Sequence, residues 1–290
     1  MKPLRLPAVA LALFAMLAGS PRIVFAQSEE RILYASVVDK DGAPVPNLTE
    51  KDFIIREDGQ AREVLSVTPD SDPLQVALLV DTGRGMRNNI NDLRRAATAF
   101  VENMREGAQI ALITLGARPT ISVPYTADRA ALKKGIDRLF AEVDSGNTLL
   151  DGIAETSEGL EKRKVPRAAI AAISTPGDLS FRHYEEVLRA LRSSGAVLHV
   201  MTLGTVNGDA DRELAVGKGT QETGGRNETV LSSMGLIPKA EELAKAISNQ
   251  YRITFSRPPR LVPPKATEVS VRNPDWRAHG LLVKTDKERQ

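Results

Sequence analysis

Hydrophobic residues follow one pattern before residue 73 and another after it. Before it, short β-rich stretches such as residues 32–38 alternate loosely between apolar and polar positions, as strands with one buried face do. After it, unbroken apolar runs alternate with segments whose apolar residues recur every three or four positions. Such runs are typical of strands buried on both faces, and the recurring spacing is typical of amphipathic helices. The runs are residues 76–80, 109–115, 168–173 and 197–203.

Helical spacing predicts the elements that separate these strands. We expect the helices at about residues 90–104, 129–139, 149–160, 184–193 and 239–248. Asp128 is placed to cap the second of them, and residues 251–255 form a strand after the last. Repeated strand–helix alternation with short connections produces βαβ units. The predicted fold class is therefore α/β, a doubly wound, mainly parallel sheet with helices on both faces, preceded by a small β unit.

Turn residues divide the chain further. Residues 57–60, Glu-Asp-Gly-Gln, lie between two β-rich stretches and predict a hairpin, and two prolines within residues 69–73 end that unit. Beyond residue 256 the chain becomes proline-rich, and we expect residues 268–271 and 281–284 to form a terminal hairpin. The predicted organisation is a leader, an N-terminal β unit, the α/β domain and a proline-rich C-terminal segment with a hairpin, at residues 1–26, 27–72, 73–256 and 257–290.

The leader has the features of a signal peptide. It begins with basic residues, Lys2 and Arg5, continues with an apolar stretch over residues 6–18, and ends in Val24-Phe25-Ala26, a small-x-small cleavage pattern. We therefore expect an exported protein, periplasmic or extracellular, that begins at Gln27. The apolar stretch is shorter than the roughly 20 residues that span a membrane, so no membrane span is expected after cleavage.

Composition narrows the classes of partner. The chain holds 39 basic and 37 acidic residues, but three of the basic ones and no acid lie in the leader, so the mature chain is near neutral. No segment concentrates Lys and Arg with aromatic residues, and no nucleic-acid partner is expected. The chain contains no cysteine, which excludes disulfides and thiol chemistry.

Asp81 is the first candidate for chemistry. It ends the apolar run at residues 76–80 and opens the loop Asp-Thr-Gly-Arg-Gly at residues 81–85. Ligands of open α/β sheets bind at the carboxyl ends of the strands. We therefore expect the Asp81 side chain at the functional edge of the sheet.

Three distant segments resemble one protein family. Residues 37–60 resemble the β lead-in of bacterial von Willebrand factor A-related proteins, residues 222–225 resemble the family's Thr-Gly-Gly turn, and residues 250–253 resemble the strand that closes its domain. The resemblance implies a von Willebrand factor A-type domain. It also implies a metal-ion-dependent adhesion site, built from three loops at the carboxyl edge of the sheet.

The three loops retain only part of that site. The first follows the pattern Asp-x-Ser-x-Ser in the family, and here it keeps Asp81 but has glycine in place of both serines. Thr148 matches the threonine of the second loop, whereas Thr175 stands where the third loop carries its aspartate. Mg²⁺ prefers six oxygen ligands, so we expect a degenerate site with Asp81 and Thr148 as its remaining metal ligands. No cofactor is expected beyond weak Mg²⁺ or Mn²⁺ binding.

The expected function is that of a non-enzymatic binding module that acts through protein–protein contacts. We expect Asp81, Arg84, Thr148 and Asp178 to form its binding residues, with the Arg84 guanidinium neutralising the Asp81 carboxylate. The partner is another protein or a cell-envelope component. Two alternatives remain open: a functional divalent-metal-dependent adhesion domain, in which waters and Asp178 replace the lost ligands, and a purely structural assembly subunit.

An aspartic protease is the enzymatic alternative. Asp81-Thr82-Gly83 and Asp144-Ser145-Gly146 resemble the acids of such enzymes, which share a proton between two carboxylates. The two tripeptides lie too close in sequence for two equivalent lobes, which disfavours this class. The histidines, His183, His199 and His279, lie in unrelated contexts, and the glycine-containing segment at residues 217–220 is predicted to be a mobile loop.

Overall fold

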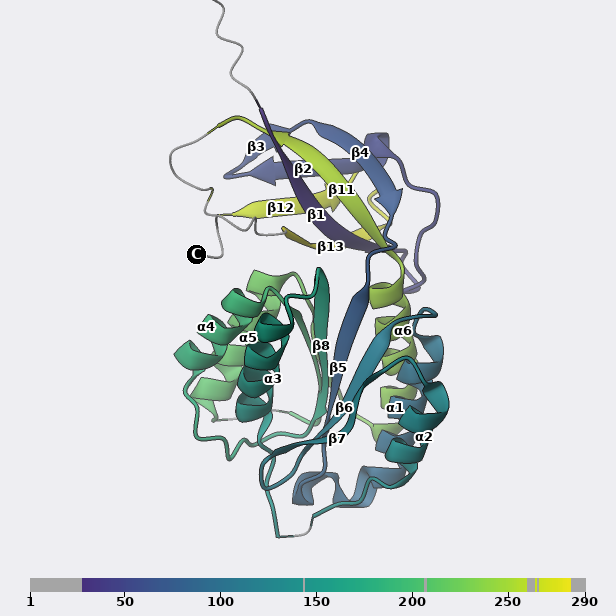
Figure 1. Ribbon diagram of the computed structural model, residues 1–290, viewed down its shortest axis with the longest axis vertical. Coiled ribbons are helices and arrows are strands. Elements are labelled where there is room, and N and C mark those ends of the chain that lie inside the picture. The colour runs from purple at the N-terminus through teal and green to yellow at the C-terminus, as the bar shows by residue number, and fades with distance from the viewer. Residues whose placement is uncertain (1–27, 143, 206–207, 260–263, 265, 283–290) are drawn as a thin grey trace, which may run out of the picture.

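Six strands form the central sheet of the computed structural model, which describes residues 28–142, 144–205, 208–259, 264 and 266–282 (Figure 1). The predicted leader at residues 1–26 lies outside the described residues. All neighbouring strands of this sheet are parallel except the last pair. The strand order is β10 (Asn227–Val230), β9 (Val197–Leu203), β8 (Arg167–Ser174), β5 (Leu74–Asp81), β6 (Gln109–Leu115) and β7 (Pro119–Thr126).

Helices cover both faces of the central sheet (Figure 1). One face carries α1 (Ile90–Asn103), α2 (Arg129–Asp137) and α6 (Leu236–Ser248). The other carries α3 (Leu149–Arg163), α4 (Tyr184–Ser194) and α5 (Ala210–Thr223). The prediction of a doubly wound α/β domain is confirmed. Among the described residues, no helix is long and apolar enough to cross a membrane.

Strand β5 shows why its sequence is an unbroken apolar run. Val76 and Leu78 are buried under α1 and α6, whereas Ala77 and Leu79 are buried under α3 on the opposite face. Because both faces are covered by helices, a polar residue in this run would lack a partner. The run ends at Asp81, the first position that reaches the loops beyond the sheet.

Two antiparallel sheets form the β unit at the amino ends of the central strands (Figure 1). The larger sheet has the order β13 (Arg277–Leu282), β1 (Glu29–Val38), β11 (Gln250–Arg257) and β4 (Val64–Pro69). The smaller has the order β12 (Thr267–Val271), β2 (Phe53–Glu57) and β3 (Gln60–Arg62), and a short 3₁₀ turn, Glu50–Asp52, precedes β2. The rings of Phe53 and Tyr251 meet edge to face in the core that the two sheets share, with centroids 5.8 Å apart.

Strand partners differ from the predictions at both ends of the chain. The strand at residues 251–255, expected to close the α/β domain, pairs with β1 and β4 of the β unit instead. The predicted terminal hairpin is wrong, because β12 pairs with β2 while β13 pairs with β1. The apolar faces of these strands cover one shared core, and burial of that core outweighs proximity along the chain.

The segment that follows the central strand β9 also differs from the prediction. Residues 217–220, expected to be a loop, lie within α5. Asp209 caps this helix by accepting a hydrogen bond from the Arg212 backbone N–H at 3.0 Å. A Cβ at Gly219 would lie 3.0 Å from a Leu191 methyl group, so glycine lets α5 pack closely against α4. Strands β7 and β10 were not predicted either.

A polar junction joins the β unit to the central sheet. The buried carboxylate of Asp70 forms ion pairs with Arg105, at 3.2 Å, and with Arg167. The Arg167 guanidinium also lies 4.8 Å from the centre of the Tyr34 ring, in β1, and burial lowers its pKa to about 10. Tyr34 in turn donates a hydrogen bond to Asp72, and burial raises the Tyr34 pKa to about 12. These contacts fix the two units against each other.

Candidate functional site

Four loops meet at the carboxyl edge of the central sheet, at the end opposite the β unit (Figure 1). We call residues 82–89, 116–118, 138–148 and 175–183 the edge loops. Backbone hydrogen bonds join three of them, and each bond links two different loops. The bonds are Arg84 N–H to Ser145 O at 3.0 Å, Glu142 N–H to Thr82 O at 2.7 Å, and Leu179 N–H to Asn147 O at 2.7 Å. The edge is therefore one interlocked surface.

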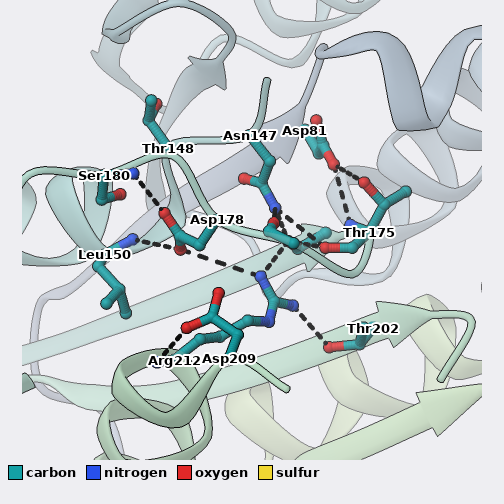
Figure 2. A network of polar contacts seen from close by, with 12 residues as sticks. Asp81, Asn147, Thr148, Leu150, Thr175, Asp178, Ser180, Thr202, Asp209 and Arg212 are labelled. Atoms are coloured by element: carbon teal, nitrogen blue, oxygen red, sulfur yellow. Dashed lines mark hydrogen bonds and ion pairs between the residues drawn. The ribbon is translucent and has the colours of Figure 1, made fainter. Parts of the chain in front are cut away.

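Asp81 is fully buried beneath these loops (Figure 2). Its Oδ1 accepts the Gly83 backbone N–H at 2.8 Å. Its Oδ2 accepts both the backbone N–H of Thr175, at 2.9 Å, and the Thr175 hydroxyl. Burial raises the pKa of Asp81, while these hydrogen bonds and the charge of Arg212 act in the opposite direction. Asp81 thus ties the first loop to the loop after β8 and is not a surface contact.

The edge loop at residues 138–148 supplies two further buried side chains. Thr148 is 3% exposed, and its hydroxyl donates to the Gly116 carbonyl at 3.3 Å. The Asn147 amide donates to Ser174 Oγ at 2.6 Å and to the Thr175 carbonyl at 3.0 Å (Figure 2). Sequence reasoning missed Asn147. Both side chains hold the loops together from beneath.

Asp178 binds the start of α3 instead of turning toward Asp81 (Figure 2). Its Oδ2 accepts the Leu150 backbone N–H at 3.1 Å, and its Oδ1 accepts the Ser180 N–H at 2.8 Å. A carboxylate is stabilised at a helix N-terminus, where free N–H groups and the helix dipole favour negative charge. Burial nevertheless raises the pKa of Asp178.

Arg212 is the functional-site residue that the sequence interpretation missed. Its side chain is 1% exposed and extends from α5 beneath the ends of β8 and β9 (Figure 2). Nη1 donates to Ser174 Oγ at 3.3 Å, and Nη2 donates to Thr202 Oγ1 at 3.1 Å. Nη1 also lies 4.0 Å from Asp178 Oδ2. The helix-capping pattern that begins at Asp209 is the sequence signal that could have revealed α5 and this arginine.

The arginine whose charge acts on Asp81 is Arg212, although its effect on the Asp81 pKa is smaller than those of burial and of the hydrogen bonds from Thr175 and Gly83. Arg84 is exposed to solvent, whereas Arg212 is the cation that lowers the pKa of Asp81. Burial lowers the pKa of Arg212 itself, and the charges of Asp178, Asp209 and Asp81 oppose that effect. Arg212 was not considered in the sequence analysis because helix α5, which carries it, was not anticipated.

Comparison with known proteins identifies the domain that carries these loops. The family model described as von Willebrand factor type A domain matches residues 76–176, which run from β5 to the start of the loop after β8. The chain contains a von Willebrand factor type A domain. No curated protein matches the chain in sequence.

Solved structures agree with this fold. A von Willebrand factor type A protein from Catenulispora acidiphila is 12% identical, with 89% of this chain and 72% of that chain covered and a TM-score of 0.52. Proximal thread matrix protein 1 from the mussel byssus is 16% identical, with 73% and 50% covered and a TM-score of 0.52. The same mussel protein with a zinc-occupied MIDAS motif is 17% identical, with 66% and 49% covered and a TM-score of 0.51. This chain spans about half the length of the mussel protein, and identities this low show the fold alone.

The type A domain of this chain does not offer the ligand set that its resemblance implies for a divalent cation. Gly83 and Gly85 carry no hydroxyl, and space for one is missing. A Cβ at Gly83 would lie 2.5 Å from the Gly146 carbonyl oxygen, and one at Gly85 would lie 2.5 Å from Thr175 Oγ1. Thr175 places a hydroxyl against Asp81 where the family has an acid. Among the described residues, no three His, Asp or Glu side chains are grouped to hold a metal ion.

The outer surface of the edge loops is apolar and basic. Three large apolar side chains point to solvent there: Phe140 is 66% exposed, Leu179 58% and Phe181 91%. In the described part of these loops the exposed arginines are Arg84, Arg87, Arg118 and Arg138, whereas Asp144 is the exposed acid. The edge loops of the type A domain therefore present exposed apolar and basic side chains.

The acids and histidines of the enzymatic alternatives have structural or surface contacts. Asp144 is exposed, whereas Asp81 is buried against Thr175. His199 is buried in β9, accepts the Arg226 N–H at 3.2 Å, and burial lowers its pKa to about 3. His183 pairs at the surface with Asp211, at 3.1 Å. The described contacts assemble none of these groups into a nucleophile–base pair.

Proposed function

We propose that this chain is an exported, non-enzymatic protein-binding module that recognises its partner through the edge loops of its type A domain. Domains of this family typically mediate protein–protein interaction or adhesion. The fold alone does not assign that role, so the proposal depends on what the edge loops expose.

The exposed apolar side chains of Phe140, Leu179 and Phe181 carry the proposal. Burying a side chain of this size is worth about 1.5–3 kcal/mol, so leaving several of them in water on adjacent loops favours their use in a contact. The loops beneath them are held by the Asp81–Thr175 bonds and by backbone hydrogen bonds. A rigid base with exposed apolar and arginine side chains is the arrangement that protein interfaces use.

The charges of the edge loops indicate what kind of partner segment fits. The edge loops expose more arginines than acids, since Asp144 is their exposed acid. Arg84 lies on the loop at residues 82–89, and Arg118 lies on the loop at residues 116–118. Complementary potentials favour encounter and disfavour wrong partners. We therefore propose a partner segment that carries both acidic and apolar side chains. The predicted leader at residues 1–26 makes that partner another exported protein.

A random-peptide display library tests the proposal. The mature chain should enrich peptides that combine acidic and apolar residues, and Phe181→Ser should weaken the best of them at least tenfold, about 1.4 kcal/mol. Arg84→Ala should weaken binding less and reduce its salt dependence. Leu65→Ser is the matched control, because Leu65 is 41% exposed but lies on β4 in the β unit.

Comparison with the Leu65→Ser control shows which results would contradict the proposal. Peptides that bind Phe181→Ser as tightly as the unmodified chain, or that lose affinity equally with Leu65→Ser, would place the contact elsewhere. A library from which no sequence is enriched would favour the structural assembly alternative.

A further inference from the structure

Arg212 is a large charged side chain enclosed almost completely by the type A domain. It is 1% exposed, and both of its terminal nitrogens donate to buried hydroxyls, one on Ser174 and one on Thr202. These two hydroxyls lie at the ends of β8 and β9. The guanidinium therefore bonds to the neighbouring strand ends directly beneath the edge loops (Figure 2).

Three acids act on this cation, and the side chains of two of them, Asp81 and Asp178, are buried. Asp178 Oδ2 lies 4.0 Å from Nη1, and the carboxylates of Asp81 and Asp209 also act on the Arg212 charge. Asp81 ends β5, and Asp178 lies in the loop after the neighbouring strand β8. A buried charge is stable only when it is paired, so these acids and Arg212 depend on one another.

We propose that the Arg212 guanidinium is a built-in cation that takes the structural role of a divalent metal ion at this edge of the sheet. The Asp178 carboxylate, which holds the start of α3, lies 4.0 Å from this guanidinium. Arg212 supplies one positive charge and directional N–H donors from within the chain. The edge loops are consequently held in place without Mg²⁺ or Mn²⁺, and partner binding is independent of both ions.

The edge loops at residues 82–89 and 175–183 pack tightly against each other and leave no space for a metal ligand. Thr175 fills the position against Asp81 with a hydroxyl, and its Oγ1 would lie 2.5 Å from a Cβ at Gly85. Gly83 is similarly closed by the Gly146 carbonyl. Glycine at positions 83 and 85 and threonine at position 175 thus pack together, and this packing leaves no space for the ligands of a metal ion. The inference does not depend on which partner the edge loops bind.

Thermal melting with and without metal tests the inference. The melting temperature of the unmodified mature chain should change by less than about 1 °C when EDTA, Mg²⁺ or Mn²⁺ is added at millimolar concentration. Arg212→Met should lower it by about 10 °C, because the buried acids lose their counter-charge. Arg212→Lys keeps the charge but cannot reach both hydroxyls, so its melting temperature should lie between those of the unmodified chain and Arg212→Met. Arg189→Met is the control, because Arg189 is exposed on α4.

Calorimetric titration of Mg²⁺ and Mn²⁺ into the unmodified chain decides the question even if Arg212→Met does not fold. Absence of binding heat at millimolar metal, together with the unchanged melting temperature, supports the built-in cation. Binding that disappears in Asp81→Ala would overturn it and restore the metal-dependent alternative. Equal melting temperatures for Arg212→Met and Arg189→Met would also overturn it, because the Arg212 guanidinium would then contribute nothing to stability.

Discussion

Thr175 donates both its backbone N–H and its hydroxyl to the same oxygen of Asp81. The two residues lie at the ends of β5 and β8, which are neighbours in the central sheet but 94 residues apart in sequence. This pair closes the gap between the first edge loop and the loop after β8. Thr175 stands at the position where the resemblance implies an aspartate. Asp81 is therefore held by hydrogen bonds from Thr175, which gives the Asp81 carboxylate a structural role.

Thr175→Val should destabilise the domain. The substitution keeps the β-branched shape and the backbone N–H but removes the hydroxyl donor from a buried carboxylate. We expect a loss of about 2 kcal/mol in the free energy of unfolding and a fall of about 4–8 °C in melting temperature. Urea denaturation measures the first quantity. Thr229→Val, at an exposed position on β10, is the control and should change little. Equal midpoints for the two variants would show that the hydroxyl contributes nothing.

Gly85 and Thr175 should be energetically coupled. Gly85→Ala places a Cβ 2.5 Å from Thr175 Oγ1, so we expect a loss of about 1–3 kcal/mol from overpacking. In a Thr175→Ala background the obstructing atom is absent, and the same substitution should cost clearly less. A double-mutant cycle measured by chemical denaturation gives the coupling energy. Additive effects would contradict the proposed steric closure.

Gly159→Ala is the matched glycine control. Gly159 lies in the interior of α3, and a Cβ there would meet nothing within 4 Å. Because alanine is the better helix former, this variant should gain up to about 1 kcal/mol in stability. Opposite signs at Gly85 and Gly159 would show that space, and not glycine itself, decides the outcome.

Buried His199 should make the protein less stable in acid. Its pKa is lowered to about 3, by burial first and then by the charges of Arg226 and His279, whereas the unfolded chain takes up this proton near pH 6.5. Stability is therefore full above pH 6.5 and falls as the pH drops toward 3, by about 2 kcal/mol at pH 5. His199→Asn should flatten the fall in melting temperature between pH 7 and pH 5.

His183 provides the control for that pH dependence. It is exposed, and its hydrogen bond to Asp211 raises its pKa. Its contribution is consequently present below pH 6.5 and is lost as the pH rises, which is the opposite sign. His183→Asn should therefore not flatten the acid limb of the melting curve. If His199→Asn does not flatten it either, other groups govern the acid stability.

Asp70→Asn should loosen the junction between the β unit and the type A domain. The Asp70 side chain is buried between Arg105 and Arg167, so neutralising it leaves two partly or fully buried guanidinium groups without their acid. We expect a loss of about 3–5 kcal/mol and faster hydrogen exchange in β1 and β11 than in β5. Asp137→Asn, at an exposed position at the end of α2, should have neither effect. Uniformly faster exchange in all three strands would indicate global destabilisation and not a loosened junction.

Local patterns in the sequence were sufficient for the four buried central strands of the α/β domain. The apolar runs at residues 76–80, 109–115, 168–173 and 197–203 correspond to β5, β6, β8 and β9, because strands covered on both faces must be apolar at every position. The position of Asp81 at a strand end followed from the same rule. Strand β10 has only four residues and was missed, since so short a segment carries little periodicity.

Contacts between distant segments decided the rest. The pairing of β11 with β1, the separation of β12 from β13, and the burial of Arg212 against Ser174 and Thr202 each depend on groups far apart in sequence. Sequence spacing specifies which side of an element is apolar, but not which other surface will cover it or which charge will be buried beside it. Those outcomes minimise exposed apolar area and unpaired buried charge over the whole chain, so only the folded structure reveals them.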